Sequence, residues 1–216
     1  MFIGHFALGF AAKRVAPRQS LAVLVLAPLW LDVVWPVLVL AGIERASIVP
    51  GNTAAQPLLL EHMPWSHSLL AALVWSALFG AVVWATTRDV RGAWVNAALV
   101  FSHWVLDVAS HAPDMQLTPW NPKRLGLGLW YSLPGTLIVE GVLFAAGAWV
   151  YLTSTHARDR VGRAGPWVFL GFLLVAYLGA MFGPPPPSAT VVAISALVML
   201  ATLPFVRWFD RRRVAV

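Results

Sequence analysis

The sequence of 216 residues contains no cysteine, and only 11% of its residues are charged, against about 25% in an ordinary soluble domain. The absence of cysteine excludes disulfides and thiolate metal sites, so any bound metal must be held by nitrogen and oxygen ligands. Hydrophobic residues make up 59% of the chain. This composition is typical of a polytopic membrane protein, and we expect a single integral membrane domain with membrane lipids as its surroundings.

Six apolar runs approach the roughly 20 residues that a spanning helix needs. They cover residues 20–43, 67–86, 93–111, 134–154, 166–183 and 188–206. The apolar segment 2–12 is too short to cross about 30 Å of hydrocarbon, and its charges follow it instead of preceding it as in a signal peptide. The predicted fold class is therefore all-α: a helical bundle with about six transmembrane helices and a short, half-inserted or re-entrant N-terminal helix.

The basic residues alternate between the connections of these runs. Twelve of the fifteen lysines and arginines fall in four segments: Lys13 to Arg18, Arg88 to Arg91, Arg158 to Arg163, and Arg207 to Arg213. The positive-inside rule places these segments and the C-terminus in the cytoplasm, with loops 44–66, 112–133 and 184–187 outside. We interpret the basic clusters as topogenic signals, and nucleic acid is not an expected partner. The remaining acids Glu44, Asp89, Asp159 and Asp210 are interpreted as ordinary loop charges.

Ionisable residues inside apolar runs are costly in a bilayer and usually mark a functional site. In the third run, His103, Asp107 and His111 follow one another at intervals of four residues, so they lie on one helix face. His103 and Asp107 are one turn apart and can reach a single cation. His111 can share that cation with Asp107 or hold a second one, and Asp114 follows at the mouth of the helix. The plainer interpretation is a buried hydrogen-bonded His–Asp pair.

Further candidate ligands lie in the first half of the chain. Asp32 is near the middle of the first run, between two prolines that can open the helix backbone, and no basic residue in that run can pair with it. His62 and His67 flank a proline just before the second run, and His5 lies in the short first helix. Histidine and carboxylate ligands suit zinc, manganese, iron or magnesium, and we expect a divalent metal, zinc or manganese above the others.

Two glutamates complete the candidate site. Glu61 lies near the rim of the predicted cavity and is a candidate general base. Glu140 lies within the fourth run, where it either orients a ligating histidine or forms a hydrogen bond between helices. All these residues fall in the segment 1–154. The segment 155–216 is expected to supply two packing helices and a basic cytoplasmic tail.

Four stretches, in this order, resemble the YdjM-like family of membrane-bound metal-dependent hydrolases of bacterial and archaeal inner membranes. They are His5 with Gly9, Pro28 to Asp32, His62 to Ser68, and Ser102 to Asp107, with a weaker likeness at Gly126 to Trp130. The resemblance implies a multi-pass protein of the cytoplasmic membrane and a metal-dependent hydrolase. The His-x-x-x-Asp element is also similar to one in zinc-dependent phospholipases C.

The chain departs from the family pattern at two places. Met63 and Pro64 replace the Arg-Gly of the third motif, which removes a basic group suited to an anionic substrate. Leu29 or Trp30 stands where the second motif has its first aspartate, which removes one ligand. The resemblance covers roughly the first half of the chain.

Three functions fit these patterns. The preferred one is a hydrolase in which Asp32, His62, His67, His103 and Asp107 hold one or two cations in a cavity open to the extracytoplasmic side. Its substrate would be a lipid, a lipid-linked phosphoester or another small molecule. The first alternative is a proton or metal-ion transporter or channel that uses Asp32, His103, Asp107 and Glu140. The second is a non-catalytic scaffold whose polar groups join helices.

Overall fold

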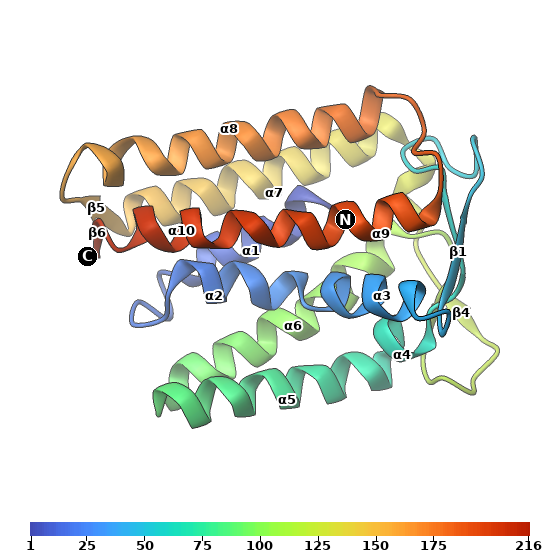
Figure 1. Cartoon of the computed structure of the whole chain (residues 1–216), viewed down its shortest axis with the longest axis horizontal. Helices are drawn as coiled ribbons and strands as arrows, with labels where there is room; N and C mark the ends of the chain where they lie inside the picture. The colour runs from blue at the N-terminus through green and yellow to red at the C-terminus, as the bar shows by residue number, and fades with distance from the viewer.

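The computed structural model describes residues 1–216, which form a bundle of roughly aligned helices (Figure 1). The helices are α1 (Ile3–Ala12), α2 (Leu21–Leu26), α3 (Leu31–Leu40), α4 (Pro64–His67), α5 (Leu69–Thr87), α6 (Val90–Ser110), α7 (Leu133–Thr153), α8 (Arg160–Phe182), α9 (Ala189–Met199) and α10 (Leu203–Asp210). Three 3-10 turns, η1 (Ala27–Leu29), η2 (Leu129–Tyr131) and η3 (Leu200–Thr202), join or precede them.

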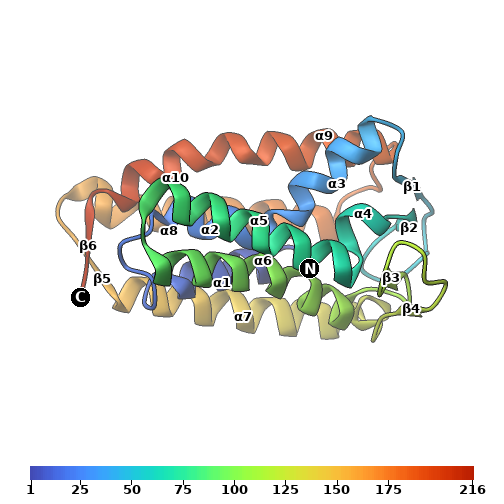
Figure 2. The same ribbon diagram turned by 90° about the horizontal axis from the view of Figure 1, so that it is seen from below.

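Six short strands form three antiparallel pairs at the two ends of the bundle (Figure 2). The pairs are β1 (Arg45–Ile48) with β2 (Leu58–His62), β3 (Met115–Gln116) with β4 (Arg124–Leu125), and β5 (Thr155–Ala157) with β6 (Arg213–Ala215). The first two pairs lie at one end, and the third lies at the other end beside the C-terminus. The predicted all-α class is confirmed. The sequence did not indicate these three strand pairs, which are short and leave the fold class unchanged.

The long helices begin at side chains that satisfy their first free backbone N–H groups. A serine or aspartate at each N-cap accepts a hydrogen bond from the residue three positions on, as such caps commonly do. The caps are Ser68 of α5, Asp89 of α6, Ser132 of α7, Asp159 of α8 and Ser188 of α9. Local sequence therefore fixes where five of the helices start, independently of any surrounding membrane.

Four helical segments are long and apolar enough to cross a membrane: α5, α7, α8, and the continuous stretch Ala189–Asp210 that contains α9 and α10. The helical segments Leu21–Leu29 and Leu31–Leu40 are bent by 55° relative to each other. They form a fifth candidate span if the bent pair counts as one. The prediction of about six spans is thus met only in part. The remaining run forms α6, which is equally long but carries Asn96, His103 and Asp107 among its buried residues.

The bend in the first run follows from its prolines. Pro28 lies in η1 at the break, and Pro36 lies inside α3 without ending it. A proline lacks an N–H and crowds the preceding turn, so it weakens helix continuity at this point. The sequence predicted a local opening around Asp32, and the structure places Asp32 in the first turn of α3, directly after the break.

The short first helix is buried in the middle of the bundle (Figures 1 and 2). It packs most closely on α7, where a Cβ added to Gly147 would come within 2.3 Å of the Ala7 carbonyl oxygen. On its other side, a Cβ at Gly9 would approach the Leu24 carbonyl to 2.6 Å. Two glycines thus allow α1 to approach both neighbours, and α1 brings His5 into the interior.

Asp210 and Lys13 form a buried pair at the end of the bundle that carries the C-terminus, so the interpretation of Asp210 as an ordinary loop charge is wrong. The Lys13 ammonium lies 2.8 Å from the Asp210 carboxylate, which also accepts hydrogen bonds from the Leu21 backbone N–H and the Tyr151 hydroxyl. Each buried charge is paired, as burial requires. These bonds join α10 to the turn between α1 and α2 and to α7.

Candidate metal centre

Two histidines and two aspartates from three separate helices converge in the interior. Asp32 comes from α3, His67 from α4, and His103 and Asp107 from successive turns of α6. The Nε2 atoms of His67 and His103 are 3.2 Å apart. Asp107 Oδ2 lies 2.9 Å from the His103 nitrogen and 3.7 Å from that of His67, and Asp32 Oδ1 lies 3.7 Å from both nitrogens. We call these four residues the His–Asp cluster.

The orientation of the His103 ring is fixed from outside the cluster. Its Nδ1 lies 2.6 Å from the backbone carbonyl oxygen of Pro28 in η1. Because a carbonyl oxygen can only accept, Nδ1 must carry a proton and donate it. In the neutral ring, Nε2 is then unprotonated and directs its lone pair into the cluster.

The His67 ring is fixed in the same way through two further side chains. The Ser66 Oγ lies 2.6 Å from Oε2 of Glu44 and 2.7 Å from Nδ1 of His67. A carboxylate only accepts, so the serine hydroxyl donates to Glu44, and its oxygen accepts the Nδ1 proton of His67. The neutral His67 ring therefore also directs an Nε2 lone pair into the cluster.

Two imidazole lone pairs that face each other at 3.2 Å in a buried site repel unless a proton or a metal cation lies between them. A divalent cation with nitrogen and oxygen ligands at about 2.0–2.2 Å would separate tetrahedral ligand atoms by about 3.3–3.6 Å. The five distances within the cluster lie between 2.9 and 3.7 Å and bracket that range. The residues therefore fit a divalent metal in donor type, tautomer and spacing.

Glu44 supports the candidate site, and its interpretation as a loop charge is wrong. Its side chain is buried, and Oε1 accepts hydrogen bonds from the backbone N–H groups of Trp65 and Ser66. A local signal did exist: α4 begins at Pro64 after Met63, which has no oxygen in its side chain to cap the helix. The free N–H groups of this turn required an acceptor from elsewhere in the chain.

His5 stands beside the cluster. Its ring stacks on that of His103 with centroids 3.8 Å apart and an interplanar angle of 2°, and its Nε2 lies 3.0 Å from Asp107 Oδ1. The buried Nδ1 of His5 has no hydrogen-bond partner. His5, His103 and Asp107 form a second set of atoms close enough to share a metal ion, alongside the set of Asp32, His67 and His103. His103 belongs to both sets.

Glu140 acts on the backbone of α1. Its Oε2 accepts hydrogen bonds from the N–H groups of Phe2 (2.7 Å) and Gly4 (3.1 Å), at the start of the helix that carries His5. The Glu140 carboxylate forms no hydrogen bond with any residue of the His–Asp cluster. Of the two roles that the sequence left open, the geometry matches the hydrogen bond between helices.

His111 lies at the edge of the cluster. It follows the last residue of α6, with Nε2 3.4 Å from Asp107 Oδ2 and Nδ1 3.0 Å from Asp114. Trp130 stacks on its ring at 4.1 Å. The segment before Trp130 is bound to the end of α6, since the Gly128 N–H donates to the His111 carbonyl oxygen. Asp114 thus orients His111, and η2 covers it.

Glu61 and His62 lie apart from these residues. Both are at the end of β2, where His62 pairs across the ladder with Arg45. Glu61 is exposed, and its backbone carbonyl, not its carboxylate, accepts a hydrogen bond from Arg124. Neither side chain forms a hydrogen bond or ion pair with the His–Asp cluster. Of the two histidines around Pro64, only His67 joins it.

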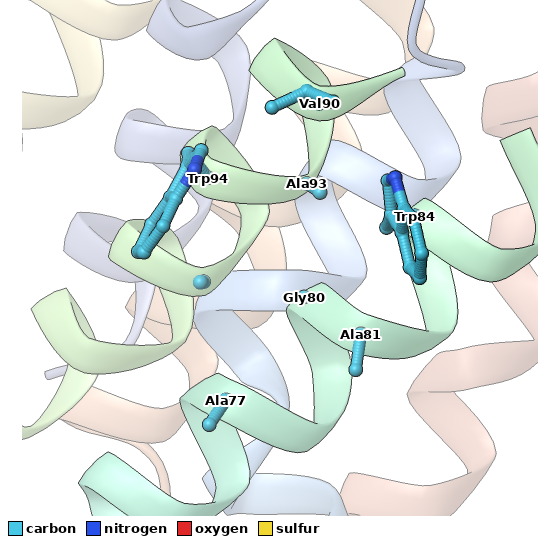
Figure 3. Close-up of a pocket in the computed structure, with 8 residues that line it drawn as sticks. Ala77, Gly80, Ala81, Trp84, Val90, Ala93 and Trp94 are labelled. Carbon is cyan, nitrogen blue, oxygen red and sulfur yellow. The ribbon is translucent and has the colours of Figure 1, made fainter. Parts of the chain in front are cut away.

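An apolar cavity of about 380 Å³ between α5 and α6 is separate from the cluster (Figure 3). Trp84 and Trp94 stand on either side of it, and small side chains such as Ala81 and Ala93 line it between them. It contains no acid, histidine or other ionisable group. This cavity therefore offers no chemistry to the candidate site.

No protein-family model, curated protein or solved structure matches the chain. The class that the fold and the site define is a helical protein with apolar helices of membrane-spanning length and a buried group of histidines and aspartates suited to a metal ion.

Proposed function

We propose that the protein is a membrane-embedded, metal-dependent hydrolase of the cytoplasmic membrane that acts on a phosphoester. The observation that carries the proposal is the pair of opposed Nε2 atoms of His67 and His103, each set in its tautomer by a partner outside the cluster. A metal site built in this way, with four buried or half-buried ligands and its own supporting hydrogen bonds, is typical of working metal centres. The resemblance to YdjM-like hydrolases in the same residues supports the reaction class.

Asp32, His67, His103 and Asp107 would hold the cation, for which zinc or manganese is the proposed identity. A bound divalent cation polarises a phosphoryl oxygen and lowers the pKa of a coordinated water. Hydrolysis then forms a bond from the water oxygen to phosphorus and breaks the ester bond, and the leaving oxygen takes a proton. Asp32 is the only ligand whose side chain is substantially exposed, at 39%, so a substrate would reach the cation on the side of Asp32.

The supporting residues would keep the ligands in place. Glu44 and Ser66 hold His67, the Pro28 carbonyl holds His103, and His5 covers the back of the His103 ring. In the proposed topology, α6 and the bent pair also cross the membrane, which gives six spans. The end with twelve basic residues is cytoplasmic, and the cluster opens toward the opposite side.

The test is hydrolysis of a panel of phosphomonoesters and diesters by purified protein in nanodiscs, followed as phosphate release from the monoesters and as alcohol release from the diesters. Activity should disappear on chelation, return with zinc or manganese, and fall by more than about a hundredfold in His103→Ala. His156→Ala, which changes an exposed histidine of β5, should behave as wild type. Hydrolysis that survives both chelation and His103→Ala would contradict the proposal. Cation flux into liposomes without any hydrolysis would favour the transporter instead.

A further inference from the structure

A second cavity, of about 390 Å³, reaches the His–Asp cluster. Asp32 is one of its lining residues and its only charged one. The remaining wall is largely apolar and includes Leu29 of η1, Ala180 of α8, and Val192 and Ala196 of α9. Its volume falls within the range of about 300–1,000 Å³ that small-molecule sites occupy. The cavity therefore brings an apolar space of ligand size to a carboxylate of the candidate metal centre.

The cluster is closed on its other sides. The side chains of His5, His67, His103 and Asp107 are at most 4% exposed, whereas that of Asp32 is 39% exposed. A molecule that approaches the cluster must therefore pass Asp32, and Asp32 faces the apolar cavity. An apolar wall favours only the binding of apolar surface that leaves water. A fully water-soluble substrate would therefore gain no binding free energy from it.

The rim of the cavity lies on an apolar outer surface. Val191 of α9 lines the cavity and is also 40% exposed, and its neighbour Ile194 is 49% exposed. Both α8 and the stretch that contains α9 are candidate membrane spans, and α9 packs mainly on α3. The cavity thus opens between two candidate spans, where hydrocarbon chains of the bilayer can enter it directly.

We propose that the substrate is a phosphoester with a hydrocarbon tail, whose tail occupies this cavity while its phosphoryl group lies at Asp32. The inference rests on the proposed hydrolase function and names its substrate class. Hydrolysis by water would break the bond between phosphorus and the oxygen that bears the tail, releasing phosphate and a long-chain alcohol. Each methylene buried in the cavity should strengthen binding by about fourfold.

The first test compares ethyl, octyl and dodecyl phosphate as substrates in nanodiscs. The value of kcat/KM should rise with chain length in the wild type. Ala196→Phe, which fills the cavity, should lower the ratio of kcat/KM for dodecyl phosphate to kcat/KM for ethyl phosphate by about tenfold or more, with the metal content retained. The matched control is Ala201→Phe, at an exposed alanine of η3 that does not line the cavity, and it should behave as wild type. Equal kcat/KM values for all three esters would overturn the tail site while leaving the hydrolase intact.

The second test does not depend on turnover. Dodecyl phosphate with a diazirine at the end of its tail is crosslinked to wild-type protein in nanodiscs, and the labelled residues are mapped by mass spectrometry. Label should concentrate on the cavity-lining residues Val192, Ala196 and Met199 of α9, and excess unlabelled dodecyl phosphate should reduce it. Label spread over exposed residues such as Val175 and Val198, with no competition, would overturn the tail site whether or not the protein is a hydrolase.

Discussion

Ser66 links a buried carboxylate to a proposed metal ligand, and its removal is the most informative perturbation of the structure. In Ser66→Ala, Nδ1 of His67 loses the oxygen that accepts its proton at 2.7 Å. The ring can then adopt the other tautomer, in which Nε2 carries the proton and cannot bind a cation. Glu44 keeps its bonds to the backbone N–H groups of Trp65 and Ser66, so α4 should remain folded.

The expected size of the effect follows from the kind of contact that is lost. Removal of a group that orients a ligating histidine typically weakens metal binding by about 10–100-fold, which corresponds to about 1.4–2.7 kcal/mol. Ser66→Thr keeps the hydroxyl and should bind metal within about threefold of wild type, since one of the rotamers open to threonine places its Oγ1 where the serine oxygen lies. The two substitutions at one position thus separate the hydroxyl from the packing around it.

The assay is a competition titration of zinc between the purified protein and a chromophoric chelator, together with a thermal unfolding curve. Ser76→Ala is the matched control, because Ser76 is also buried but bonds only to the Ala72 carbonyl of its own helix. An unchanged zinc dissociation constant in Ser66→Ala, with folding intact, would refute the assignment of the His67 tautomer.

Three further predictions concern residues around the cluster and at the membrane boundary. Glu140→Ala should lower the free energy of unfolding by about 1.5–3 kcal/mol in denaturant titrations, because two N–H groups at the start of α1 lose a charged acceptor. Glu61→Gln and His62→Ala should retain full zinc content by mass spectrometry, since neither side chain contacts the cluster; loss of metal in either would contradict the placement of β2. The Gly162 backbone N–H and the Arg212 guanidinium hold the pKa of Asp159 below its ordinary value of 3.8. Its carboxylate therefore stabilises the fold above about pH 3.8, and Asp159→Asn should lower Tm at pH 7 but converge with wild type as the pH falls below that value.

Patterns that act within one helix could be predicted from the sequence. The apolar runs gave the helices, and the four-residue spacing of His103 and Asp107 placed both on one face of α6, as the structure shows. Asp32 was identified because an unpaired acid in an apolar run is costly. Its proximity to His67 required the 55° bend between the two halves of the first run, whose angle no local pattern specifies.

Contacts between distant segments could not be predicted in the same way. Glu44 reaches Ser66 across 22 positions of the chain, through the β1–β2 hairpin, and nothing in the local sequence connects the two. His62 and His67 looked equivalent on either side of Pro64, yet one lies in a strand and the other in a helical turn. Their different roles depend on where the strand ends, and element boundaries are the least reliable part of any sequence-based prediction.

The central claim is that His67 and His103 bind one metal ion between them, and metal content measures this most directly. Wild-type protein, His103→Ala and the exposed-site control His156→Ala would be purified in detergent without a histidine tag, soaked with zinc and manganese, desalted, and analysed by inductively coupled plasma mass spectrometry. Near-stoichiometric metal in wild type and His156→Ala, with its loss in His103→Ala, is the predicted result. Absence of metal from the correctly folded wild-type protein, or its full retention in His103→Ala, would contradict the claim.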